Sequence, residues 1–208
     1  MTIKFGTDGI RGPVESKITP EVCLRIGHAA GIVLKEMGWE TVLIGKDTRV
    51  SGYMLESALQ AGFIAAGVNV RLLGPLPTPG VAYLTKSLRN QFGLVISASH
   101  NSFADNGIKF FNSIGTKLND EIETEIERFL EKPNLTKNSI DLGRASIDSL
   151  ARERYQEFCI STYAGDRDLS SFKIVFDLIM GNSPRGIITS FTFITICFLG
   201  EYYLGLIP

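Results

Sequence analysis

Two polar runs in the middle of the chain carry the side chains best suited to chemistry. The run SASHNS occupies residues 97–102, and DNGIK follows at residues 105–109. A Ser hydroxyl acts as a nucleophile or phosphate carrier only with activation or strong electrostatic help. His100 beside Ser99 can donate a hydrogen bond to an oxyanion, and Lys109 can supply a fixed positive charge or, if desolvated, a base. The alternative is a plain polar turn, which composition alone favours because Ser and Asn prefer turns.

A glycine-rich run near the start of the chain has the composition of an anion-binding segment. FGTDGIRG at residues 5–12 places three Gly around one acidic residue and Arg11. Gly allows backbone N–H groups to approach an anion closely, and an Arg side chain can bind phosphate through two parallel hydrogen bonds. The run lacks the G-x-G-x-x-G spacing, so it is not a dinucleotide-binding fingerprint.

A second glycine-flanked run, GKDTRVSG at residues 45–52, ends one predicted strand and opens the next predicted helix. It lacks the G-x-x-x-x-G-K-[ST] spacing of a phosphate loop. Two interpretations therefore stay open for this run. Either Lys46 and Arg49 bind an anion, or they are solvated side chains in an ordinary strand-to-helix turn.

Alternating strand and helix patterns predict the elements that position these runs. Short segments rich in Val, Ile and Leu predict buried strands at Thr41–Asp47, Val68–Leu73 and Gly93–Ser97. Helical patterns predict four helices, at Pro20–Met37, Gly52–Gly67, Gly80–Arg89 and directly after Asn119. This alternation predicts an α/β fold in which a mixed, largely parallel sheet is sandwiched between helices. Ligands gather beyond the carboxyl ends of parallel strands, where the SASHNS run is expected to lie.

Helix start signals and apolar faces support these elements. Thr19 before Pro20, and Thr78 before Pro79, place an N-cap residue ahead of a first-turn Pro. The helix that Asn119 caps is expected to bury Ile122, Ile126 and Phe129, and helix 52–67 has one apolar and small-residue face: Leu55, Ala58, Leu59, Gly62 and Ala66. His28, the only other His, lies in a helical pattern and is expected to be structural.

The motifs also occur in an order that resembles a known family. FGTDGIRG, GKDTRVSG, GPLPTPGVAYL and SASHNSFADNGIKFF follow one another along the chain. Together they resemble the bacterial phosphoglucosamine mutases of the alpha-D-phosphohexomutase superfamily, from Phe5 to about Glu127 and more loosely to Phe176. FGTDGIRG and YMLESAL are closer to the glucosamine branch than to the glucose or mannose branches. The resemblance implies an isomerase that interconverts glucosamine 6-phosphate and glucosamine 1-phosphate.

The resemblance implies that Ser99 carries a phosphoryl group, passes it to a sugar phosphate and takes the other phosphate back through a bisphosphate intermediate. It places His100 beside the phosphoserine and makes Arg11 and Lys109 the active-site cations. It also implies that a phosphoserine oxygen helps to hold Mg²⁺. Further contacts to phosphate or sugar are expected from a set of six residues: Thr7, Asp8, Gly9, Asn101, Lys46 and Arg49.

The chain departs from the family pattern in two ways. Ser102 replaces the Pro of S-H-N-P, which removes a backbone restraint and predicts a looser turn. Family members have four domains, and the D-G-D-x-D-R metal loop, the E-x-S-G sugar loop and the last phosphate clamp do not occur in this sequence. One lost charge-stabilising group typically costs ~2.7–4 kcal/mol of barrier, so mutase activity by this chain alone is not expected. The alternative is a sugar-phosphate-binding module or an interaction protein.

The same pattern predicts two units. Residues 1–140 form the first α/β/α domain with the phosphoserine loop, and residues 141–208 form an incomplete second α/β unit. Glu131–Arg144 is the expected linker, followed by a helix near Ile147–Tyr163 and a strand at Phe172–Asp177. In the apolar tail 186–208 the only charge is Glu201, which is typical of a frameshifted or truncated gene or of a natural short variant. A membrane span there is disfavoured, because ~20 mostly apolar residues are needed.

Composition excludes several classes of protein. The 44% hydrophobic and 21% charged fractions are those of an ordinary globular chain and exclude intrinsic disorder. A net charge of −1 creates no field to attract nucleic acid or anionic lipid. The partner that the family resemblance implies is a small sugar phosphate. Three distant Cys without a C-x-x-C pair favour a reducing cytoplasm over a disulfide framework or a zinc site.

Overall fold

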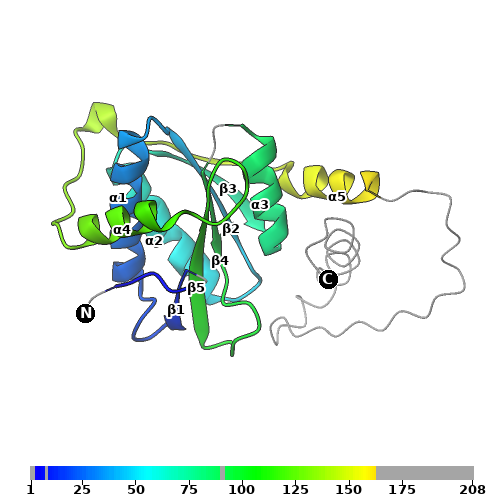
Figure 1. Cartoon of the computed structure of the whole chain (residues 1–208), viewed down its shortest axis with the longest axis horizontal. Coiled ribbons are helices and arrows are strands. Elements are labelled where there is room, and N and C mark those ends of the chain that lie inside the picture. Colours follow the sequence, from blue (N-terminus) through cyan, green and yellow to red (C-terminus); the bar gives the residue numbers. More distant parts are fainter. Residues whose placement is uncertain (1–2, 8, 90–91, 163–208) are drawn as a thin grey trace, which may run out of the picture.

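The computed structural model describes residues 3–7, 9–89 and 92–162, which form a three-layer α/β/α arrangement (Figure 1). Its helices and strands follow one another along the chain in this order: β1 Ile10–Pro13, α1 Pro20–Glu36, β2 Thr41–Lys46, α2 Ser51–Ala65, β3 Asn69–Pro75, α3 Thr78–Ser87, β4 Phe92–Ile96, β5 Asp105–Phe111, α4 Asp120–Leu130, a 3₁₀ turn Ser139–Asp141, β6 Ala145–Ile147 and α5 Ala151–Ser161.

These residues build one six-stranded sheet with the strand order β1-β5-β4-β2-β3-β6. The pairs β2–β3, β2–β4 and β3–β6 are parallel, whereas β5 pairs antiparallel with both β4 and β1. The predicted mixed, largely parallel α/β sheet is therefore confirmed. The three strands predicted from their apolar runs correspond to β2, β3 and β4.

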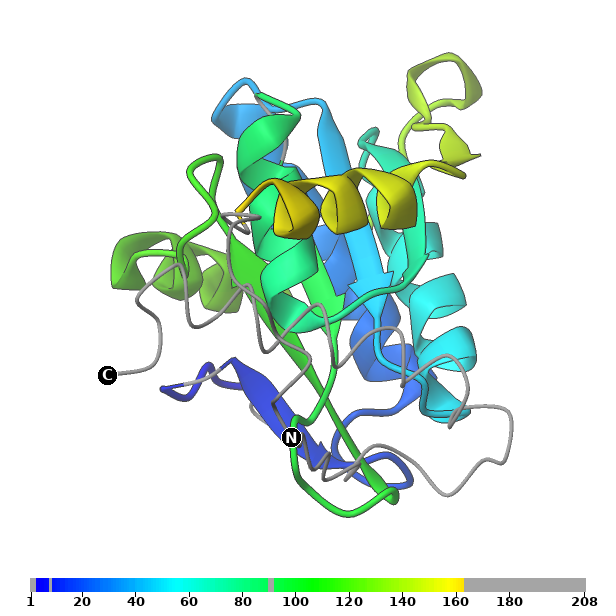
Figure 2. The same ribbon diagram turned by 90° about the vertical axis from the view of Figure 1, so that its right-hand side faces the viewer.

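Each face of the sheet carries its own apolar core. Val42 and Ile44 of β2 pack with residues of α1, α2 and α4, whereas the intervening Leu43 packs with residues of α3 and α5. This alternation is the two-residue period of a strand with both faces covered. Figure 2 shows α3 and α5 crossing the face of the sheet that is turned toward the viewer.

Helices α1 and α2 approach each other closely where both carry glycine. A Cβ atom on Gly62 would lie 2.2 Å from the carbonyl oxygen of Leu24 and 2.7 Å from the amide nitrogen of His28. A Cβ atom on Gly27 would lie 2.4 Å from the carbonyl oxygen of Leu59. Since these neighbours are backbone atoms, the two helices can pack at this distance only without side chains at the crossing.

Several predicted helix details hold and others differ. Thr19 caps α1 as predicted, because its hydroxyl oxygen accepts a hydrogen bond from the Val22 amide. The predicted N-cap at Thr78 is wrong: Thr78 is the first residue of α3, Pro77 occupies the cap, and no side chain caps this end. His28 is buried, and a ring nitrogen lies 2.9 Å from the Leu135 carbonyl oxygen, in line with its predicted structural role.

The end of the described chain differs more from the predictions. The helix predicted near Ile147–Tyr163 corresponds to α5, which begins only at Ala151. Ile147 belongs instead to β6 and pairs with Leu72 of β3. Strand β6 and α5 thus extend the sheet and the α3 layer beyond the predicted boundary at residue 140. The division into two units stays a prediction, and the predicted strand 172–177 and apolar tail lie outside the described residues.

Gly62→Ala tests the helix crossing. We expect this substitution to lower the free energy of unfolding by about 1–3 kcal/mol through overpacking, although Ala is a better helix former than Gly. Urea unfolding followed by circular dichroism measures the change. Gly52→Ala in the same helix is the matched control, because the atom nearest to its Cβ would be Lys46 Cδ at 3.4 Å. Equal behaviour of the two variants would contradict the packing argument.

Candidate active site

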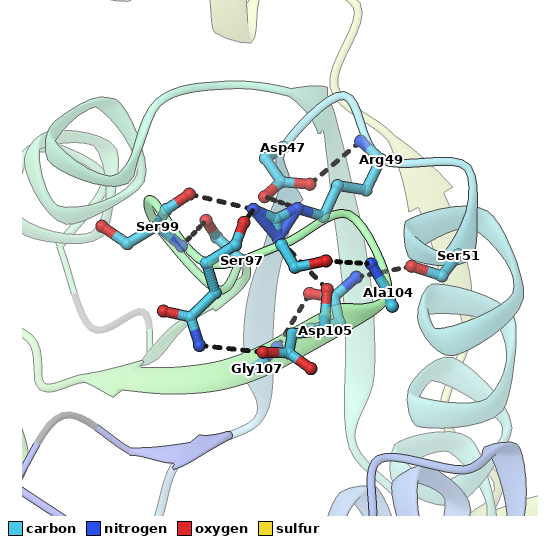
Figure 3. Close-up of polar contacts among 11 residues, drawn as sticks. Asp47, Arg49, Ser51, Ser97, Ser99, Ala104, Asp105 and Gly107 are labelled. Atoms are coloured by element: carbon cyan, nitrogen blue, oxygen red, sulfur yellow. Dashed lines mark hydrogen bonds and ion pairs between the residues drawn. The ribbon is translucent and has the colours of Figure 1, made fainter. Parts of the chain in front are cut away.

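The loop between β4 and β5 presents Ser99 in an uncommon backbone conformation. Ser99 has a φ of 58° and is the only non-glycine residue with positive φ among the described residues. Its amide donates to Ser97 Oγ at 3.1 Å (Figure 3). The Asn101 amide donates to the Ala98 carbonyl oxygen at 3.1 Å. Both Ser99 and His100 are exposed, whereas Ser97 is buried. The turn therefore holds the Ser99 hydroxyl on the surface and keeps the neighbouring Ser97 inside.

A left-handed conformation at a non-glycine residue costs of order 1–3 kcal/mol and persists only where the surroundings enforce it. Such strain is concentrated at functional sites, so the backbone singles out Ser99 independently of any motif. Sequence reasoning could not detect this signal, because Ser occurs in turns of every type.

Arg11 lies close to the start of this loop, although it belongs to β1 and the loop follows β4, with β5 between these two strands. Arg11 of β1 lies opposite Gly107 of β5, and the Ser97 amide donates to the Gly107 carbonyl oxygen at 2.9 Å. A Cβ atom on Gly107 would lie 2.7 Å from Arg11 Cγ and 2.8 Å from the Ser97 carbonyl oxygen. The missing side chain at Gly107 thus gives the Arg11 side chain its place beside the start of the loop.

Lys109 lies on the same face of β5 as Gly107, because side chains two residues apart in a strand point to the same side. Lys109 and Gly9 both line a pocket of about 190 Å³. Gly9 has a φ of 85°, and a Cβ atom there would lie 2.2 Å from the Ile108 carbonyl oxygen, so only glycine fits this close approach. Register and packing thus bring Arg11, Gly9 and Lys109 to one side of the sheet. Thr7, two residues before Gly9, is exposed, and Asp8 lies outside the described residues.

Lys46 is buried rather than solvated. Its side chain is 5% exposed, its Nζ lies 2.5 Å from Glu56 Oε2, and it lies 4.6 Å from the centre of the Tyr53 ring. The interpretation of Lys46 as a solvated turn residue is therefore wrong. A buried ammonium group needs a partner such as the Glu56 carboxylate, because an unpaired charge in the interior is very costly. A role for Lys46 in binding an anion stays a prediction.

Arg49 is likewise not solvated, since its side chain is only 9% exposed. Its guanidinium group donates to the carbonyl oxygens of Ser99, Asn101 and Asp105, and its backbone amide donates to Asp47 Oδ1 (Figure 3). The structure thus places Arg49 against the backbone of the Ser99 loop. The sequence showed a cation near a predicted strand end but gave no sign of these partners, which lie about fifty positions away along the chain.

Other polar groups of the loop and of neighbouring elements also hold the loop in place, through contacts that the sequence did not reveal. Asn101 Nδ2 donates to Asp105 Oδ2 at 3.1 Å, and the buried Asn106 donates from Nδ2 to Ser51 Oγ at 2.9 Å. Ser102 accepts from the Asp105 amide through its carbonyl oxygen at 3.0 Å. The loop therefore has several restraints that need no proline, and the predicted looseness at Ser102 stays a prediction.

The residues described by the structure contain no group of three or more His, Cys, Asp or Glu side chains that could hold a metal ion. Asp105 and Asp47, the carboxylates at this loop, already accept hydrogen bonds from Asn101 and Arg49. None of the helices within the described ranges is long and apolar enough to span a membrane.

Comparisons with known proteins assign the family. Residues 2–137 match the model of the phosphoglucomutase/phosphomannomutase alpha/beta/alpha domain I. The chain belongs to this family. It is 58% identical to a phosphoglucosamine mutase of Cupriavidus pinatubonensis over 87% of this chain and 42% of that protein, and 58% identical to one of Chromobacterium violaceum over 85% and 41%. The chain thus spans about two fifths of the length of these relatives.

Solved structures of the family share the fold. A putative phosphomannomutase from Thermus thermophilus superposes with a TM-score of 0.68 at 31% identity, over 77% of this chain and 36% of that one. A phosphoglucomutase/phosphomannomutase family protein from Burkholderia thailandensis superposes with a TM-score of 0.63 at 26% identity, over 76% and 35%. The resemblance inferred from the motifs is therefore confirmed at the level of family and fold.

A pair of substitutions tests the strain at Ser99. We expect Ser99→Gly to have a free energy of unfolding about 1 kcal/mol higher than Ser99→Ala, because glycine adopts positive φ without a Cβ clash. Both variants lack the hydroxyl, so their difference reports the backbone. Urea unfolding of the two variants measures it. A Gly variant that is no more stable than the Ala variant would show that the turn is unstrained.

Proposed function

We propose that Ser99 is the phosphoryl carrier of a phosphohexomutase reaction, with glucosamine 6-phosphate and glucosamine 1-phosphate as the substrate pair. The observation that carries this proposal is the exposed Ser99 hydroxyl on a strained turn, with His100 next to it. The relatives at 58% identity, which are named phosphoglucosamine mutases, support the choice of sugar. A small sugar phosphate in the cytoplasm is the partner that this role requires.

The reaction needs two transfers at one oxygen. In the first, a bond forms between Ser99 Oγ and the phosphorus of a sugar bisphosphate, the bond from phosphorus to the sugar oxygen breaks, and the Ser99 hydroxyl proton passes to that oxygen. In the second, the hydroxyl of a sugar monophosphate takes the phosphoryl group and Ser99 regains its proton. Catalysis of phosphoryl transfer depends mainly on positioning the reactants and on stabilising negative charge in the transition state. Nearby cations are therefore expected to lower most of the barrier.

We assign those cations to Arg11 and Lys109, with His100 as a donor to the phosphoryl oxygens. Arg11 can bind two oxygens of one phosphoryl group, and Lys109 adds a compact charge from the same side of the sheet. Thr7, Asp8, Gly9 and Asn101 are proposed as contacts to phosphate or sugar. The strand register that puts Arg11 opposite Gly107, with Lys109 two residues further, supports this grouping.

Magnesium is part of this proposal only through the phosphate. A phosphoryl group on Ser99 would supply oxygen ligands, which Mg²⁺ prefers, and a bound Mg²⁺ would neutralise charge on the transferred group. The roles proposed above for Ser99, His100, Arg11 and Lys109 do not include a direct bond from their own side chains to the metal. The proposal for this chain is phosphoryl transfer to Ser99, and complete isomerisation is not expected of it.

Intact-mass spectrometry tests the proposal directly. After incubation of the full chain with glucosamine 1,6-bisphosphate and Mg²⁺, we expect one added phosphate, which is lost in Ser99→Ala. Peptide mapping must place it on Ser99 rather than on Ser97 or Ser102, which are the matched hydroxyls of the same loop. An unmodified mass, or a phosphate on either neighbour, would overturn the assignment and favour a sugar-phosphate-binding or interaction module.

A further inference from the structure

We infer that Arg49 is a positioning residue that holds the Ser99 turn in its left-handed conformation. The inference concerns the loop geometry itself, and its consequence for phosphoryl transfer rests on the function proposed above. It assigns Arg49 a role different from binding the phosphate of a substrate.

The guanidinium group joins both sides of the loop. Arg49 Nη2 donates to the carbonyl oxygens of Ser99 at 3.0 Å and of Asn101 at 2.8 Å, and Nη1 donates to the carbonyl oxygen of Asp105 at 3.1 Å. These acceptors lie at the Ser99 turn, two residues after it and at the first residue of β5. A planar fork of N–H donors suits such divergent acceptors, because its donor directions are fixed.

The anchor of this group is the central sheet. Asp47 follows β2 directly, and its backbone amide donates to the Ile96 carbonyl oxygen, the last residue of β4, at 2.9 Å. Asp47 Oδ1 accepts from the Arg49 amide at 3.0 Å, and Oδ2 lies 3.5 Å from Arg49 Nε. The Asp47 side chain is 3% exposed, so its carboxylate is fixed in position. Arg49 is thus oriented by a buried carboxylate attached to the strand next to the loop.

The donors of Arg49 leave little for an anion. Of its five side-chain N–H groups, three donate to loop carbonyls and Nε faces Asp47, which leaves one Nη1 donor. With only 9% of the side chain exposed, a phosphate could gain two parallel bonds only by taking Arg49 away from the loop. The arrangement therefore favours support of the backbone over recognition of a ligand.

This support explains how a strained turn persists at an exposed loop. The bond to the Ser99 carbonyl oxygen fixes the peptide group that follows Ser99, and the bond from the Ser99 amide to Ser97 Oγ fixes the preceding one. With both flanking peptide groups held, the backbone angles of Ser99 are determined. The direction of its hydroxyl then depends on Arg49 without any contact between the two side chains.

Amide hydrogen exchange of the full, unphosphorylated chain tests the inference. We expect Arg49→Lys to raise the exchange rates of the Ser99, Asn101 and Asp105 amides about tenfold or more, because one ammonium group cannot reach three divergent carbonyls. The amides of β2 and β4 should keep their protection. Arg25→Lys is the matched control, because Arg25 donates to the backbone carbonyl of Leu130, at the end of α4, and not to a carbonyl of this loop.

The rate of Ser99 phosphorylation by glucosamine 1,6-bisphosphate gives the second readout. We expect Arg49→Lys to lower the saturating rate about tenfold and to leave the half-saturating bisphosphate concentration within about twofold. The reason is that the substitution disturbs the orientation of the Ser99 hydroxyl and not the affinity for the bisphosphate. A raised half-saturating concentration with an unchanged rate would indicate phosphate binding and overturn the inference.

Failures of the two proposals can be told apart. If the parent chain takes up no phosphate, the proposed function fails, while hydrogen exchange still tests Arg49. If exchange in the loop is the same in Arg49→Lys, Arg49→Ala and the parent chain, Arg49 does not hold the turn. Asp47→Asn serves where Arg49→Ala does not fold, and it should loosen the loop less than Arg49→Lys, since it keeps the guanidinium group.

Discussion

The left-handed backbone conformation of Ser99 is unfavourable in free energy, and an isolated turn would not keep it without bonds to the rest of the fold. The bonds on either side of it, from Arg49 to the Ser99 carbonyl oxygen and from the Ser99 amide to Ser97, meet that cost. Both partners are placed by the ends of β2 and β4, neighbouring parallel strands in the middle of the sheet. The direction of the exposed Ser99 hydroxyl is therefore fixed by residues that follow two central strands, although Ser99 itself lies on a loop.

Strands β1 and β5 bring the other half of the site by a different device. Strand β5 runs antiparallel to both of its neighbours, β4 and β1, and the register between β1 and β5 places Arg11 directly opposite Gly107. Because residue 107 is glycine, the Arg11 side chain can pass close over β5, where a Cβ atom on residue 107 would lie 2.7 Å from Arg11 Cγ. A side chain there would separate Arg11 from the loop. The sheet thus supports the Ser99 loop through β2 and β4, and Gly107 of β5 leaves room for the Arg11 side chain beside that loop.

The sequence predicted what depends on local pattern. Helix α1 has a Thr-Pro start and a continuous apolar face, and β2 to β4 are apolar runs between polar ends, so these elements were located within a few residues. Strand β5 was missed because Asp105, Asn106 and Gly107 are typical turn residues. Strand β5 is stabilised instead by hydrogen bonds to distant residues, such as the bond from Asn106 to Ser51, which no local pattern reveals.

The candidate site follows the same division. Ser99, His100 and Lys109 were predicted as site residues from their types and from the order of the motifs. The contacts of Asp47, Gly107 and Arg49 depend instead on partners that folding brings from distant positions. The two cations of the GKDTRVSG run likewise have partners inside the protein that no local pattern reveals. Lys46 is paired inside with Glu56, and Arg49 is committed to backbone carbonyls.

This commitment also bears on the serine that replaces proline at position 102. A proline restricts only its own φ and the residue before it, which here would be Asn101. The Arg49 guanidinium group reaches the Asn101 carbonyl oxygen and also those of Ser99 and Asp105, on both sides of that position. Its restraint covers more of the loop than the ring would. The geometry around Ser99 is therefore compatible with Ser102, because Arg49 and the hydrogen bonds within the loop restrain the turn without a proline ring.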